Sequence, residues 1–154
     1  MRADSTGLWV LTDAECWRLL AGAPVGRVVV SMNAMPAALP VNYQLIGREI
    51  YFRTAAGTKM TAAVNRTVVA FQVDEFDSAG TSGWSVLVVG TARLVSDPDE
   101  RALLDAAGIR SWVTDPAARY VAISVERITG RRLQHSRPDA AAVWSTAVPP
   151  GAVG

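Results

Sequence analysis

The chain is poor in the side chains that acid–base and nucleophilic enzymes use most often. Its 154 residues include one cysteine, Cys16, and one histidine, His135. A single cysteine cannot form an internal disulfide, so we expect a protein of the reducing cytoplasm. The two residues lie far apart in the sequence, which does not favour a cysteine–histidine nucleophile.

Net charge and long apolar runs are also lacking. The formal net charge is +1, so no overall positive field would attract nucleic acid or an acidic membrane surface. No apolar run approaches the roughly 20 residues of a membrane helix. The polar start, Met1 to Thr6, does not resemble a secretory signal. We therefore expect neither a nucleic-acid partner nor a membrane partner.

What the chain does have is enough apolar sequence for one core. Half of its residues are hydrophobic and 19% are charged, which is typical of a globular chain rather than a disordered one. We expect a single domain over residues 1–154. Its core should extend over about 12–137, followed by an irregular, alanine- and proline-rich tail at 138–154.

Short β-branched runs dominate the sequence after an initial helix. The helix is expected at 13–23, because Thr12 and Glu15 form a capping box before it. Later turn residues divide the chain into short elements. Strands are predicted at 27–32, 37–46, 49–54, 67–74, 84–96 and 119–127, helices at 58–65, 98–107 and 109–113, a turn at 33–36 and a loop at 76–83.

This order predicts a mainly β fold with a few short helices. The strands follow one another too closely for the crossover helices that parallel pairing requires. Six antiparallel strands at hairpin spacing point to a small barrel, because closure removes the exposed edges of a sheet.

Lysine is the scarcest basic residue, and its position is informative. All but one of the fifteen basic residues are arginine, and Lys59 is the exception. Lys59 follows a strand end and the small residues 55–57, where a helix begins. Such a corner exposes backbone N–H groups that suit a phosphate. The alternative is an ordinary corner, with Thr58 as helix cap and Lys59 in water.

Neighbouring residues add to this candidate phosphate site. Arg53 and Lys59 supply positive charge, and Thr54 and Thr58 supply hydroxyl groups. Gly57 allows the backbone to approach a ligand closely. The corner is therefore a candidate phosphate site, and the ordinary strand-to-helix corner stays open as the alternative.

Two other features are candidates for ligand contact. Asn42, Tyr43 and Gln44 are polar residues in an otherwise apolar predicted strand, where they would either hydrogen-bond a planar heterocycle or face water. Trp84 opens a very apolar strand after a flexible loop, and it suits a core, an interface or a ligand contact.

Five segments in a fixed order carry a resemblance to a known family. The ordered set resembles the pyridoxamine-phosphate-oxidase-like family, the FMN-binding split β-barrels, over roughly residues 12–128. The segments are Gly26-Arg27-Val28-Val29-Val30, Pro40-Val41-Asn42-Tyr43, Phe52-Arg53-Thr54, Gly57-Thr58-Lys59 and the run from Trp84 to Leu94 that contains Gly90 and Ala92.

The resemblance implies a six-stranded antiparallel split barrel that forms a homodimer, with two FMN sites at the subunit interface. Lys59, Thr58 and Arg53 would hold the phosphate. Thr54 would line the site beside the Gly57 backbone. The isoalloxazine edge would lie along Val41, Asn42 and Tyr43, and Trp84 and Ser85 would reach over from the partner subunit.

The resemblance fixes neither the reaction nor the substrate. The corner reads Gly-Thr-Lys where the family has Ser-Arg-Lys, and Arg132 and His135 have the wrong spacing for the vitamin B6 site. We therefore expect a flavin-dependent oxidoreductase acting on an unidentified small molecule. The alternatives are an F420-dependent reductase on the same fold and a non-catalytic protein that binds flavin or haem.

Overall fold

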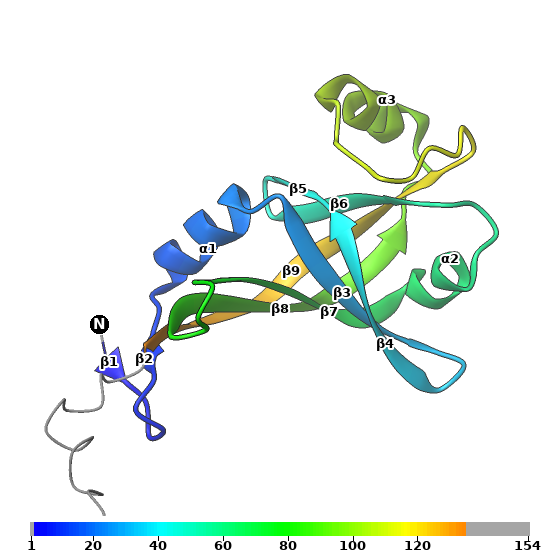
Figure 1. Ribbon diagram of the computed structural model, residues 1–154. Helices are drawn as coiled ribbons and strands as arrows, with labels where there is room; N and C mark the ends of the chain where they lie inside the picture. Colours follow the sequence, from blue (N-terminus) through cyan, green and yellow to red (C-terminus); the bar gives the residue numbers. More distant parts are fainter. Residues whose placement is uncertain (1, 135–154) are drawn as a thin grey trace, which may run out of the picture.

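Antiparallel strands build most of the protein, and the computed structural model describes residues 2–134 (Figure 1). This confirms the predicted mainly β class with a few short helices; the predicted tail at 138–154 lies outside the described residues. The elements are β1 (Arg2–Ala3), β2 (Trp9–Val10), α1 (Asp13–Gly22), β3 (Val25–Met32), β4 (Met35–Asn42), β5 (Gln44–Ile46), β6 (Glu49–Thr54), α2 (Lys59–Val64), β7 (Thr67–Phe76), β8 (Ser82–Leu94), α3 (Pro98–Ala107) and β9 (Arg119–Gln134).

The strands form one curved sheet whose two ends approach each other. Neighbours follow the order β4-β3-β7-β8-β9-β6-β5, and every pair is antiparallel. The chain passes from β4 into β5 at Tyr43, and β4 also approaches β6. One edge of β9 pairs with β8, while its other edge pairs first with β6 and then with β2. The result is the split barrel that the resemblance implied.

Alternating side chains fill the barrel, as the period of a strand requires. Phe52, Phe71, Ile50 and Ile123 are fully buried inside it. Helix α1 covers one end and contributes Leu20 to the same core. A core of this size is sensitive to truncation, since removing a buried phenylalanine side chain costs about 3–5 kcal/mol.

A second apolar cluster lies outside the barrel, under α3. Arg93 on β8 donates to Glu100 of α3 at 2.6 Å and forms an ion pair with Glu49 of β6 at 3.2 Å. These contacts attach α3 to β8 and to the start of β6. The buried residues of this cluster are Tyr51, Val95, Leu104, Ile109, Tyr120 and Ala122.

Nine strands are present in the described residues where six were predicted. The predicted strand 37–46 is divided because the chain exchanges partners at Tyr43, from β3 to β6. The strands β1 and β2 have two residues each, which is too short for a visible alternation. The predicted helix at 109–113 is wrong: the segment is irregular after Gly108 ends α3 in a left-handed conformation with φ 63°.

Three further boundaries differ from the prediction. The predicted turn at 33–36 is tighter, because Asn33 and Ala34 alone make it with φ of 52° and 61°. The predicted loop at 76–83 is also shorter, since strand pairing reaches Phe76 and Gly83. The last strand does not end at 127, because its pairing with β8 continues to Gln134.

A β-bulge interrupts the pairing of β9 with β8, after which the pairing resumes. The close approach of the two backbones at the bulge requires a glycine on β8. Val89 pairs with Arg127 while Gly90 pairs with Val125, which leaves Glu126 without an opposite residue. A Cβ atom on Gly90 would lie 1.7 Å from the backbone oxygen of Ser124. Backbone cannot move aside as a flexible side chain can, so this position accepts no side chain without distortion of the ladder.

We expect Gly90→Ala to lower the free energy of unfolding by about 3 kcal/mol, because overpacking against backbone forces the strands apart. Urea denaturation measures the change. Gly22→Ala is the matched control, since a Cβ atom there meets no atom within 4 Å; in a helix this change is expected to be neutral or mildly stabilising. Equal stabilities of the two variants would contradict the packing argument.

Candidate functional site

The predicted corner forms where β6 gives way to α2. Thr58 caps the helix, because its hydroxyl accepts a hydrogen bond from Thr61 N at 3.2 Å. Gly57 has φ 69°, a left-handed conformation that favours glycine. Helix α2 has six residues, so its dipole is small and any anion here depends mainly on side-chain charge and backbone N–H groups.

Lys59 is exposed at this corner and lies beside a hairpin that the sequence analysis did not associate with it. Figure 1 shows the tip of the β3–β4 hairpin and α2 at the same end of the barrel. The two elements enclose a hollow of about 200 Å³. The residues that line it are Ser31, Met32, Asn33, Lys59, Ala62 and Ala63.

The rest of the corner opens on a second hollow, of about 370 Å³. Gly57 and Thr58 line it together with Thr61, Asn65 and Leu94, and Ala62 is shared with the first hollow. The predicted phosphate residues therefore border two adjacent depressions on either side of α2. The hairpin tip has no local signal for this role, because its contact with α2 depends on the tertiary fold.

Arg53 is turned away from Lys59, toward the loop that follows α3. Its Nη2 donates to the backbone oxygen of Asp115 at 3.5 Å, and its guanidinium carbon lies 5.6 Å from the centre of the Tyr120 ring. Thr54 is buried beside it. The structure thus separates Arg53 from the exposed lysine, and its contact with a phosphate stays a prediction.

Asp115 is a residue of the corner that the sequence analysis missed. Its carboxylate accepts hydrogen bonds from Ala56 N at 3.3 Å and from Ala117 N at 2.9 Å. The signal was weak: an aspartate before a proline is typical of a turn, and nothing in the sequence indicates which other segment that turn contacts.

The polar residues at the β4–β5 junction are more deeply buried than side chains that contact the edge of a bound ring system need to be. The hydroxyl of Tyr43 donates to the backbone oxygen of Leu20, and burial raises the pKa of this tyrosine. Asn42 is also buried, and its Nδ2 donates to Pro24 O at 3.4 Å. Val41 is half-buried beside them. Their roles along an isoalloxazine edge stay predictions.

Asn42 and Arg53 share an unusual property. Among the described residues, Asn42 Oδ1 and Arg53 Nε are buried side-chain atoms without a hydrogen-bond partner. Asn42 ends β4 and Arg53 lies in β6, and these two strands contact each other. Buried polar groups are normally paired, so one acceptor and one donor with unused capacity occur on two contacting strands that lead to the corner.

Trp84 and Ser85 lie at the other end of the molecule. Trp84 packs against the barrel core and the cluster under α1, and Ser85 Oγ accepts a hydrogen bond from Gln72 Nε2 at 3.2 Å. Leu94, which lines the second hollow, is ten residues beyond Trp84 on β8. At about 3.3 Å per residue, the part of β8 between Trp84 and Leu94 extends up to roughly 33 Å. One subunit does not bring the two together.

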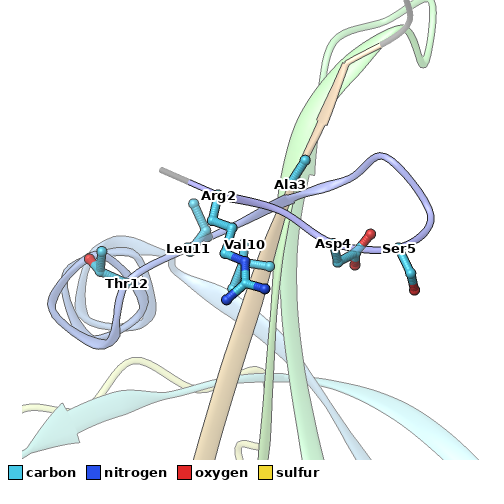
Figure 2. A pocket seen from close by; sticks show the side chains of 7 residues that line it. All are labelled: Arg2, Ala3, Asp4, Ser5, Val10, Leu11 and Thr12. Atoms are coloured by element: carbon cyan, nitrogen blue, oxygen red, sulfur yellow. The ribbon is translucent and has the colours of Figure 1, made fainter.

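A further hollow, of about 540 Å³, lies beside β1 and β2 and contains no predicted site residue (Figure 2). It is lined by Arg2, Ala3, Asp4, Ser5, Val10, Leu11 and Thr12. Hydrogen bonds from Thr6, and a weaker one from Arg131, lower the pKa of the Asp4 carboxyl to about 2. These contacts hold the first turn against β9. The charged groups of this hollow therefore have a structural role and do not require a ligand.

Two other kinds of feature are absent from residues 2–134. No group of three metal-binding side chains occurs there. No helix in this range is long and apolar enough to cross a membrane.

Known proteins with similar sequences and structures define the family. The sequence profile of the pyridoxamine 5'-phosphate oxidase family matches residues 12–132. An uncharacterised protein of Mycobacterium tuberculosis is 37% identical over 124 residues, which are 77% of this chain and 81% of that protein. The chain belongs to the pyridoxamine 5'-phosphate oxidase family.

Solved structures show the same fold. The FAD-binding protein of Mycobacterium smegmatis is 34% identical, with a TM-score of 0.73, over 82% of this chain and 99% of that one. A Corynebacterium glutamicum protein described provisionally as a pyridoxamine 5'-phosphate oxidase is 32% identical, with a TM-score of 0.72, over 83% of this chain and 99% of that one.

Proposed function

We propose that the protein binds FMN and acts as a flavin-dependent oxidoreductase on a small molecule that the structure does not identify. The observation that carries this proposal is the exposed Lys59 at a glycine-containing corner, in a chain of the pyridoxamine 5'-phosphate oxidase family. The similar protein of Mycobacterium smegmatis binds FAD, which supports a flavin as the ligand.

The residues of the corner fit such a cofactor. Lys59 supplies a mobile positive charge for the phosphate, and Thr58 and the backbone at Gly57 border the adjacent hollow. The partnerless Asn42 Oδ1 and Arg53 Nε provide an acceptor and a donor nearby. Thr54, Val41 and Tyr43 complete the proposed surroundings.

A bound flavin would supply the redox chemistry itself, while the protein positions it. Because the flavin would carry out the redox step, the protein would need few nucleophilic or acid–base side chains. This agrees with a chain that has one cysteine and one histidine. The residues of this chain then have three tasks, which are to hold the phosphate, orient the ring system and exclude water.

We further propose a homodimer, because Trp84 and Lys59, which are assigned to one site, lie toward opposite ends of one subunit. The outer face of β3, β7 and β8 supplies an apolar surface for a second copy. In its centre Val29 pairs with Ala70, and Ala70 pairs with Val89. Val68 and Leu87 on the same face are 69% and 42% exposed. A continuous apolar face of this kind is typical of an interface.

The first test replaces Lys59. Lys59→Ala is expected to weaken FMN binding at least tenfold and to leave riboflavin binding unchanged, because riboflavin lacks the phosphate. Lys59→Arg should retain part of the FMN affinity, since the charge is kept. Titrations followed by flavin fluorescence measure both affinities.

Arg18→Ala is the matched control, because it removes one exposed positive charge from α1. Its affinity for FMN should equal that of the unaltered protein. An unchanged FMN affinity in Lys59→Ala would refute the phosphate role of Lys59.

The second test concerns the dimer. Leu87→Asp places a charge in the apolar face and should convert the protein to a monomer at micromolar concentration, as sedimentation equilibrium measures. Leu103→Asp is the matched control, since Leu103 is 73% exposed on α3, away from that face. The proposed interface would be contradicted if the unaltered protein is a monomer. It would also be contradicted if Leu87→Asp remains a dimer as Leu103→Asp does.

A further inference from the structure

Asp115 occupies a position that an anionic ligand would be expected to take. Its Oδ2 accepts the hydrogen bond of Ala56 N at 3.3 Å, inside the turn that precedes Thr58 and Lys59. A backbone N–H group in such a turn is also a donor that a phosphate oxygen would use. The carboxylate therefore satisfies, from within the chain, one of the donors of the proposed phosphate corner.

The loop holds this carboxylate in place. Ala117 N donates to Asp115 Oδ1 at 2.9 Å, and Ala118 N donates to Asp115 O at 3.0 Å. Because its own turn orients the side chain, little conformational entropy opposes the contact with Ala56.

The loop is attached to the barrel by contacts other than this carboxylate. Ile109 and Ala118 are buried, Arg101 Nη2 donates to Ala118 O at 3.4 Å, and Arg53 Nη2 donates to the backbone oxygen of Asp115 at 3.5 Å. The fold therefore does not require the charge of Asp115, and a neutral residue of the same shape should leave the loop where it is.

The charge matters for a ligand instead. Arg53 and Lys59 are the cationic residues assigned to the corner, and the carboxylate of Asp115 brings a negative charge to the turn between them. We propose that Asp115 is an internal competitor of the ligand phosphate, which must displace the carboxylate from Ala56 N or bind beside it. Asp115 thus lowers the affinity for phosphate-bearing ligands relative to uncharged ones.

This inference rests on the proposed flavin site, and it predicts a selective effect. Asp115→Asn keeps the shape and one acceptor oxygen of the side chain but removes its charge. We expect FMN to bind this variant about three to ten times more tightly, the range for relieving one like-charge contact in a partly solvated site. Riboflavin, which has no phosphate, should bind with unchanged affinity.

The experiment compares the unaltered protein, Asp115→Asn and Asp13→Asn in titrations with FMN and riboflavin. Asp13→Asn makes the same change in net charge on α1, and its affinities should match those of the unaltered protein. Asp115→Ala is a second variant in case the asparagine protein does not fold, and circular dichroism checks each fold. An FMN affinity that is unchanged or weaker in the Asp115 variants would overturn the inference; a weaker one would mean that Asp115 positions the corner.

A third ligand separates this inference from the proposed function. Inorganic phosphate is titrated while the amide resonance of Ala56 is followed by NMR. If neither the unaltered protein nor any variant binds flavin, the proposed function fails. Tighter phosphate binding by Asp115→Asn would still support competition by Asp115. Equal phosphate affinities in Asp115→Asn and the unaltered protein would contradict it.

Discussion

The pairing of β8 with β9 is the interaction on which the other elements depend. The ladder runs from Ser82 opposite Gln134 to Leu94 opposite Val121, interrupted by the bulge at Gly90. Its length allows β9 to serve both as a wall of the barrel and as the attachment for β6 and β2 on its other edge. Without a glycine at position 90, the ladder would meet a side chain where Ser124 O approaches β8.

The position of the candidate site follows from this ladder. Because Thr54 at the end of β6 pairs with Arg119 at the start of β9, the corner after β6 and the loop before β9 leave the sheet together. That adjacency brings Asp115 to Ala56 and Arg53 to Tyr120. The same ladder carries Trp84 to the opposite end of the molecule, which is why a site that includes both Trp84 and Lys59 needs two subunits.

Local features of the fold could be predicted from the sequence. The capping box of Thr12 and Glu15 forms as expected and Thr58 caps α2, because each feature depends on residues within one helical turn. The change of partner at Tyr43 was hidden, since an uninterrupted extended segment looks the same whether it pairs with one strand or two.

The candidate site could be predicted only in part, for the same reason. Lys59, Thr58 and Gly57 are adjacent in sequence, so their shared corner was visible. The hairpin tip at Asn33 and the carboxylate of Asp115 reach that corner through contacts across the fold. The most direct test of the account is the absorption spectrum of the freshly purified protein, followed by mass analysis of any released cofactor. The account predicts a flavin spectrum and the mass of FMN; a colourless protein that takes up neither FMN, FAD nor F420 would contradict it.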